Sequence, residues 1–68
     1  MINFIETKKV IDIYREKTYL GNIFLSSNYE KYFFEPSGIA ISESQLTAIL
    51  EKMRELNNEL IAQTNSNK

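Results

Sequence analysis

The sequence predicts an α+β fold, in which a three-stranded antiparallel β-meander is followed by one long C-terminal α-helix. Two observations support this prediction. Residues 9–35 alternate short segments rich in β-branched and aromatic residues with polar turns, and residues 43–62 carry apolar side chains at three- and four-residue spacing without proline or glycine. A chain of 68 residues has the size of one small domain. We assign residues 1–63 to that domain and residues 64–68 to a polar C-terminal tail.

The first two predicted strands form a hairpin. Lys9–Tyr14 and Thr18–Leu25 are rich in residues that favour strands, and they flank the polar turn Arg15–Thr18. Gly21 lies inside the second of these strands and indicates a bulge or the close approach of another segment. The preceding residues 1–6 are partly apolar, and they either extend the first strand or form an arm that packs against the domain.

The third strand is predicted over Glu30–Glu35. It ends before Pro36, because proline has no N–H to donate to a neighbouring strand. Side chains alternate along a strand, so Tyr32 and Phe34 share one face, while Lys31, Phe33 and Glu35 share the other. The face with Tyr32 is the better core face, and Phe33 is therefore expected on the outer face of the sheet.

A capped helix is predicted from Glu43 to about Ala62. Ser42 stands three residues before Gln45, the spacing at which a serine caps the first helical turn and a glutamine reaches back to the serine amide. The acidic Glu43 also suits the positive end of the helix dipole. The apolar residues of this segment form one stripe: Leu46, Ile49, Leu50, Met53, Leu56 and Leu60. We therefore interpret Ser42 as a helix cap rather than as a nucleophile.

The predicted helix is longer than the predicted sheet. About twenty helical residues span roughly 30 Å, whereas a strand of about six residues spans roughly 20 Å. The side chains that the sheet then covers are Leu46, Ile49, Leu50 and Met53. Leu56 and Leu60 lack cover in a monomer, so we expect a homodimer formed through Met53, Leu56 and Leu60, whose spacing also matches a short coiled coil. In the alternative interpretation, an N-terminal arm with Phe4 and Ile5 folds over these leucines.

Composition narrows the chemistry that the chain can perform. Histidine and cysteine are both absent, which removes the usual general base, the thiol nucleophile and the soft metal ligands. We therefore expect no enzyme activity, no metal site, no cofactor and no small-molecule substrate. Eight basic and nine acidic residues leave a net charge of −1, which argues against strong non-specific binding to nucleic acid. Neither an apolar run of about eighteen residues nor a signal-peptide pattern occurs, so we expect a cytoplasmic protein without a membrane span.

Aromatic and basic residues of the strands form a candidate partner-binding surface. Phe33 is expected near Tyr14 or Tyr19 and next to Lys31 on the outer face. A surface of this kind anchors a protein interface, and it can also stack bases and contact phosphates. In a third interpretation, the N-terminal arm or a second copy of the chain covers Phe33.

Charge is divided between the strands and the helix. The basic residues that support binding of nucleic acid by the sheet are Lys9, Arg15, Lys17 and Lys31. Glu51, Glu55 and Glu59 lie four residues apart and form an acidic line along the helix. Such a line can imitate the phosphates of a nucleic acid and occupy a basic groove, but with Lys52 and Arg54 beside it the line also fits an ordinary solvated helix face.

The segment YFFEPSGIAISESQLTAILEKMRELN combines an aromatic strand, a proline–glycine turn and a capped helix. In this order of features it resembles small accessory proteins encoded by bacteriophages and mobile elements, of which anti-CRISPR proteins are the best-known class. The resemblance implies a stand-alone protein that binds a host defence, nuclease or transcription complex, in the host cytoplasm if it is phage-encoded. The predicted element order is also similar to the arm-binding N-terminal domain of tyrosine recombinases, which inserts its sheet into a DNA major groove, but this chain lacks the dense basic sheet of that domain.

The leading hypothesis is therefore a non-catalytic protein-binding module, an inhibitor or adaptor of a host defence or nucleic-acid-processing complex. Its candidate partner-binding residues are Tyr14, Tyr19, Lys31, Phe33, Glu51 and Glu55. The alternative is a small nucleic-acid-binding protein that uses its basic, tyrosine-containing sheet face.

Overall fold

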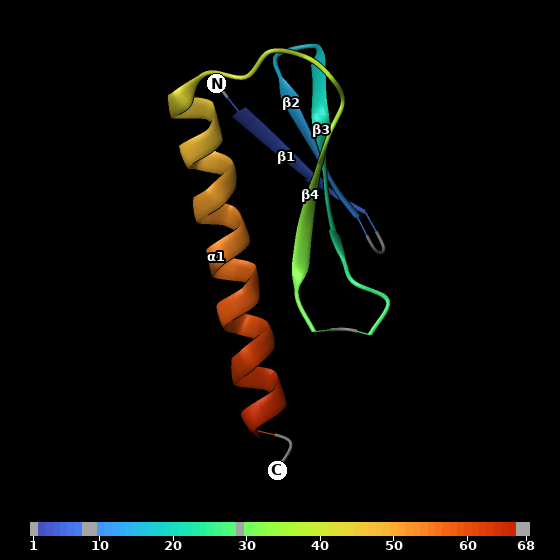
Figure 1. Ribbon diagram of the computed structural model, residues 1–68, viewed down its shortest axis with the longest axis vertical. Coiled ribbons are helices and arrows are strands. Elements are labelled where there is room, and N and C mark those ends of the chain that lie inside the picture. The colour runs from blue at the N-terminus through green and yellow to red at the C-terminus, as the bar shows by residue number, and fades with distance from the viewer. Residues whose placement is uncertain (1, 8–9, 29, 67–68) are drawn as a thin grey trace.

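The computed structural model describes residues 2–7, 10–28 and 30–66. Four antiparallel strands form one sheet in the order β1-β2-β3-β4, and a helix follows them. The elements are β1 (Ile2–Glu6), β2 (Val10–Arg15), β3 (Thr18–Leu25), β4 (Tyr32–Pro36) and α1 (Glu43–Ser66). In Figure 1, α1 lies against one face of the sheet, no described element covers the other face, and the last turns of α1 extend past the sheet. The predicted α+β class is confirmed.

The sheet has four strands rather than the predicted three, because residues near the N-terminus form an edge strand. β1 pairs with β2 in antiparallel register, with Phe4 opposite Ile13, and Phe4 packs on the core side. The backbone N–H and the hydroxyl of Thr7 both donate to the Val10 carbonyl oxygen at 2.9 Å, which ties the end of β1 to the start of β2. Residues 2–6 therefore form a separate strand, rather than an extension of the next strand or an arm packed against the domain. Lys9, where the first strand was predicted to begin, lies outside the described residues.

The predicted β2–β3 hairpin is confirmed, and it contains a β-bulge. Ile13 pairs with Gly21, whereas Tyr14 pairs with Tyr19, so Leu20 has no direct partner across the hairpin. Gly21 has a φ of 144°, which L side chains rarely adopt. The extra residue turns Leu20 into the core, where it is fully buried. The bulge or close approach predicted at Gly21 is therefore present.

β4 covers Tyr32–Pro36, and it begins two residues later and ends one residue later than predicted. The backbone N–H groups of residues 30 and 31 donate to Ser26 Oγ at 3.1 and 3.3 Å, so these residues form a turn rather than a strand. Pro36 takes the last position of an edge strand, where its missing N–H leaves no gap in the sheet.

α1 begins at Glu43 with the predicted cap. The Gln45 N–H donates to Ser42 Oγ at 3.3 Å, and the Ser42 N–H donates to Gln45 Oε1 at 3.0 Å. Gln45 Oε1 also accepts a 3.1 Å hydrogen bond from Arg15 Nη1, which ties the first turn of the helix to the end of β2. The helix continues to Ser66, beyond its predicted end, because neither proline nor glycine interrupts it.

The core lies between α1 and the sheet face that it covers. The buried apolar side chains are Ile11, Ile13, Leu20, Ile23, Ile49 and Leu56. Tyr32 and Phe34 of β4 pack against this cluster, whereas Phe33 is 42% exposed. The predicted alternation of side chains along β4 is therefore confirmed.

The helix presents a different line of residues to the sheet than the sequence predicts. Leu46 and Leu50 are expected to be covered, but they are 49% and 46% exposed. Leu56, in contrast, is only 8% exposed, so the expectation that it lacks cover in a monomer is wrong. Ile49 and Leu56 lie about two helical turns apart, and together they mark the line of α1 that faces the sheet. The core therefore reaches about one helical turn further along α1 than predicted, to Leu56 instead of Met53.

The helix cap leads to a stability prediction. The change Ser42→Ala is expected to lower the free energy of unfolding by about 1 kcal/mol, because the Gln45 N–H loses its side-chain acceptor. Chemical denaturation followed by circular dichroism measures this loss. Ser42→Asp keeps an acceptor oxygen and is the matched control, expected within about 0.5 kcal/mol of the wild type. Equal losses in the two variants would contradict a capping role for the hydroxyl.

Candidate functional site

The outer face is the surface of the sheet that points away from α1. Side chains alternate between the two faces of a strand, so the strand registers arrange the outer-face residues in three rows across the sheet. The first row holds Asn3, Tyr14 and Tyr19, the second Ile5, Asp12, Asn22 and Glu35, and the third Val10, Phe24 and Phe33. This face is the candidate functional site.

Two aromatic pairs occupy the ends of the outer face. The rings of Tyr14 and Tyr19 lie 5.4 Å apart between centroids and are tilted by 58°. The rings of Phe24 and Phe33 lie 5.8 Å apart at an angle of 32°. Lys31 extends this second pair, because its Nζ lies 5.5 Å from the centroid of the Phe33 ring. Both pairs keep an accessible ring, since Tyr19 and Phe33 are 38% and 42% exposed.

Polar side chains of the middle row separate the two aromatic pairs. Asn22 Nδ2 donates to the Tyr19 hydroxyl at 3.1 Å and lies 3.5 Å from Glu35 Oε1. The Tyr19 hydroxyl donates in turn to Asp12 Oδ1 at 3.4 Å. Both contacts to the carboxylates are long for hydrogen bonds, so these bonds are weak. The middle row therefore presents two carboxylates, one from β2 and one from β4, with an amide and a phenol between them.

The structure brings together four of the six predicted partner-binding residues. Tyr14, Tyr19, Lys31 and Phe33 all belong to the outer face or its rim. Phe33 does not lie next to the tyrosines, however, because the middle row separates them. The aromatic neighbour of Phe33 is Phe24. β1 and β4 form opposite edges of the sheet, so the predicted arm does not cover Phe33.

The basic residues predicted to share this surface are dispersed. Arg15 points to the helix side, where its Nη1 contacts Gln45 and lies 3.4 Å from the Ala40 carbonyl oxygen. Lys17 is exposed in the turn between β2 and β3, and Lys9 lies outside the described residues. Among the described residues, Lys31 is thus the cation that contacts an outer-face ring.

Sequence reasoning missed the outer-face residues whose position depends on strand register. These are Asn3, Ile5, Val10, Asp12, Asn22 and Phe24, whereas Glu35 shares its strand face with Phe33 as predicted. Counting every second residue from Tyr19 places Ile23 on the outer face, but the bulge at Leu20 reverses the alternation and places Phe24 there instead. Gly21 was the available signal, because a glycine inside a strand marks such a bulge.

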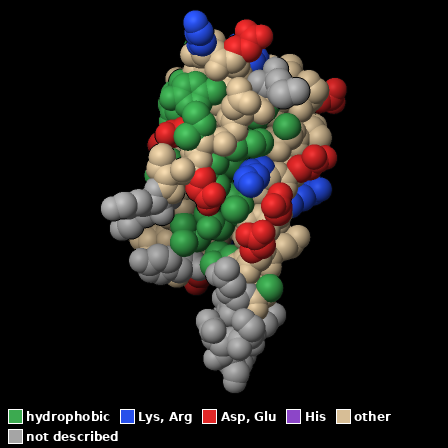
Figure 2. Space-filling model, turned by 180° about the vertical axis from the view of Figure 1, so that it is seen from behind, with side chains coloured by type: hydrophobic (Ala, Val, Ile, Leu, Met, Phe, Trp, Pro, Cys, Tyr) green, Lys and Arg blue, Asp and Glu red, His purple; other side chains and the backbone are tan. Residues whose placement is uncertain are grey.

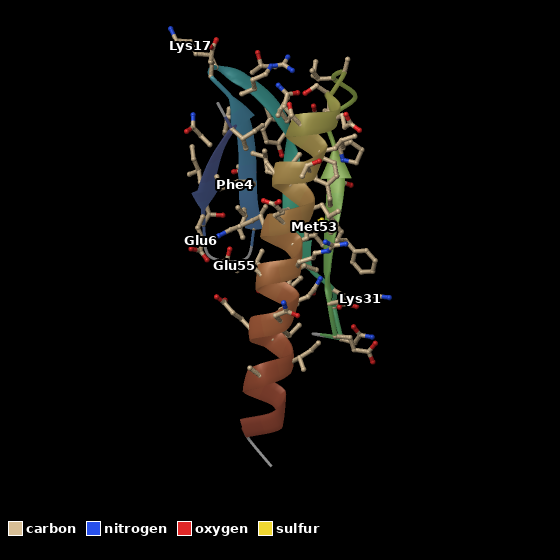
Figure 3. The ribbon with its side chains drawn as sticks, turned by 90° about the vertical axis from the view of Figure 1, so that its left-hand side faces the viewer. Phe4, Glu6, Lys17, Lys31, Met53 and Glu55 are labelled. Atoms are coloured by element: carbon tan, nitrogen blue, oxygen red, sulfur yellow. The ribbon has the colours of Figure 1, made fainter. Side chains whose placement is uncertain are left out.

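The remaining two predicted residues, Glu51 and Glu55, lie on the other side of the molecule. Both are exposed on α1, and Figure 3 shows Glu55 on the β1 side of the helix, away from Lys31 on the β4 side. In Figure 2, acidic side chains gather along an apolar band, with a basic side chain among them. Lys52 of α1 contacts β1, because its Nζ lies 5.9 Å from the centroid of the Phe4 ring. The acidic line of the helix and the outer face are therefore two separate surfaces.

The predicted dimerisation residues are packed to different degrees. Leu56 belongs to the buried core, and Met53 and Leu60 are half-buried. Asn57 Oδ1 accepts a 2.9 Å hydrogen bond from the Tyr32 N–H, which joins this part of α1 to β4. Packing within one chain accounts for Leu56, and a homodimer stays a prediction.

In the described part of the chain, no group of three Asp or Glu side chains is placed to hold a metal ion. Of the residues that the structure describes, none form a helix with the length and apolar character needed to span a membrane. Comparison of the chain with protein-family models, with curated proteins and with solved structures finds no match.

Proposed function

We propose that this protein is a non-catalytic protein-binding module that engages its partner through the outer face of the sheet. The observation that carries the proposal is the pair of aromatic clusters, Tyr14 with Tyr19 and Phe24 with Phe33, on a face that no described element covers. An antiparallel sheet with one solvated face normally alternates apolar residues inside with polar residues outside. Aromatic residues on both faces depart from that pattern, and aromatic residues are enriched among the anchors of protein interfaces.

The rigidity of the outer face favours binding. Its side chains stand on paired strands rather than on loops, and the rings pack against each other within each pair. Association orders side chains at a cost of about 0.5–1.5 kcal/mol for each flexible one. Aromatic rings that are already held in place lose less freedom, so more of their contact energy remains as affinity.

The role of inhibitor or adaptor of a larger host complex rests on the resemblance to small phage-encoded accessory proteins. The absence of histidine and cysteine supports action by stoichiometric binding, since the usual acid–base and nucleophilic groups are missing. Nucleic acid is the second candidate partner, but the outer face supports it less well. Asp12 and Glu35 stand in the middle of this face, where phosphates would be repelled, and Arg15 is engaged on the helix side.

The proposal predicts that removal of the exposed outer-face rings weakens binding of the partner. The immobilised full chain is incubated with lysate of candidate host cells, and retained proteins are identified and then titrated. The double variant Tyr19→Ala/Phe33→Ala is expected to weaken binding of the captured protein by roughly tenfold or more, because exposed aromatic anchors dominate such interfaces.

The double variant Leu46→Ala/Leu50→Ala is the matched control, because it removes two apolar side chains of similar exposure from α1. It is expected to bind like the wild type. Circular dichroism verifies that both variants fold, and Phe33→Ser alone serves as the test if the outer-face double variant does not. Loss of capture in the helix variant, with full capture by the outer-face variant, would reject the outer face as the binding surface.

A further inference from the structure

We infer that the outer face recognises a cationic segment of its protein partner, with an arginine side chain seated over the middle row between the two aromatic pairs. This inference rests on the proposed function and names the chemistry of the partner. The two carboxylates that would receive the cation are those of Asp12 on β2 and Glu35 on β4, which flank Asn22 on β3. Neighbouring strands are about 4.8 Å apart, so the two carboxylates rise from backbones roughly 10 Å apart.

The carboxylates retain most of their capacity to accept hydrogen bonds. Asp12 Oδ1 accepts a 3.4 Å contact from the Tyr19 hydroxyl, and Glu35 Oε1 lies 3.5 Å from Asn22 Nδ2. A carboxylate offers about four lone-pair positions, and contacts of this length are weak. A guanidinium group that approaches from solvent can therefore bind either carboxylate through a bidentate pair of charge-assisted hydrogen bonds.

The aromatic pairs suit the same cation. A guanidinium or ammonium group within about 6 Å of a ring centroid is attracted to the ring face, and arginine also stacks on aromatic rings through its planar group. The protein itself places a cation in this way, because Lys31 Nζ lies 5.5 Å from the Phe33 ring centroid. Tyr19 stands on the other side of the middle row with 38% of its surface exposed, and it provides a second ring for a cation held by Asp12.

Charge complementarity favours a cationic protein segment over the two other possible occupants of the outer face, which are a second copy of the chain and a nucleic acid. A second copy that stacked its outer face on this one would place both Asp12 and both Glu35 carboxylates in one interface, where like charges repel. The phosphates of a nucleic acid would meet the same carboxylates. A protein segment that carries arginine has the opposite charge, and it buries the aromatic rings and neutralises the acids together.

The test uses a labelled hexa-arginine peptide as the probe, with fluorescence anisotropy against the full chain at low and moderate ionic strength. Hexa-glutamate and a single-stranded oligonucleotide are the comparison probes. The variant Asp12→Asn/Glu35→Gln removes both outer-face charges and keeps the size of the side chains. Glu51→Gln/Glu55→Gln changes the net charge by the same amount on α1, where both residues are exposed.

The outer-face variant is expected to lose about tenfold in affinity for hexa-arginine, because it loses charge-assisted hydrogen bonds and ion pairs. The helix variant is expected to bind like the wild type, and the comparison probes are expected to bind weakly to every form. An equal loss in the two variants would overturn the inference, as would an oligonucleotide that binds more tightly than hexa-arginine. The mass of the protein in solution is measured as its concentration rises. A mass that doubles for the wild type, and stays that of a monomer only for Tyr19→Ala/Phe33→Ala, would assign the outer face to a second copy of the chain.

Failure of this inference is distinguishable from failure of the proposed function. If Asp12→Asn/Glu35→Gln captures the natural partner with unchanged affinity while Tyr19→Ala/Phe33→Ala loses it, the outer face binds a protein but not through a cation. If neither variant changes capture, the proposed function itself is rejected.

Discussion

Replacing Gly21 with alanine is expected to lower the free energy of unfolding by about 3 kcal/mol, because strain at a glycine-only backbone conformation and steric overlap act together. Gly21 has a φ of 144°, and a Cβ placed there would overlap the Glu35 carbonyl oxygen. The same Cβ would lie 3.0 Å from Phe34 Cε1 and 3.0 Å from Pro36 Cα. Two of these three neighbours are backbone atoms of β4, so relief requires the adjacent strand to move.

The position of Gly21 in the sheet increases this effect. It pairs with Ile13 on one side and with Pro36 on the other, so movement of its backbone disturbs both β2 and β4. Small domains commonly have total stabilities of about 5–15 kcal/mol, and a loss of this size is a large fraction of that range. Thermal unfolding is expected to shift downwards by roughly 12–24 °C.

The measurement is chemical and thermal denaturation of Gly21→Ala beside Gly38→Ala. Gly38 also has a positive φ, of 97°, but a Cβ added there has no atom within 4 Å. Its alanine variant therefore reports backbone strain alone, expected at about 1–2 kcal/mol. A loss at Gly21 no larger than the loss at Gly38 would show that β4 does not approach the bulge closely.

The second large effect is expected at Leu56. The change Leu56→Ala is predicted to cost about 3 kcal/mol of stability, since it removes a side chain that is only 8% exposed from the core and leaves a cavity. Leu50→Ala makes the same chemical change on the same helix, but Leu50 is 46% exposed. Its cost is expected to stay within about 0.5 kcal/mol.

Parallel denaturation curves of the two leucine variants give the comparison directly. Because residue type, helix and substitution are the same, differences in helix propensity cancel. The result also tests which line of α1 faces the sheet. Similar losses at both positions, or a larger loss at Leu50, would contradict the packing of α1 through Ile49 and Leu56.

Much of the candidate site was accessible from local patterns. Strand alternation alone places Phe33 on one face of β4 and Tyr32 and Phe34 on the other face, and the structure agrees. The membership of Asp12 and Glu35 in one row was not accessible in this way. It depends on the registers of β2 with β3 and of β3 with β4, and the bulge at Leu20 shifts the first of these.

The sequence by itself determined the features that arise from interactions between residues close along the chain. The α+β class, the hairpin, the start of the helix and its cap at Ser42 and Gln45 all follow from spacings of a few residues. Only the tertiary structure decided that residues 2–6 pair as a fourth strand and that Leu56 rather than Leu50 enters the core. A stripe of six apolar residues on α1 is wider than the line that one sheet can cover, and the choice of that line depends on how the helix crosses the strands. That crossing is set by packing between segments far apart in the sequence, such as the contact of Asn57 with Tyr32, and no local pattern records it.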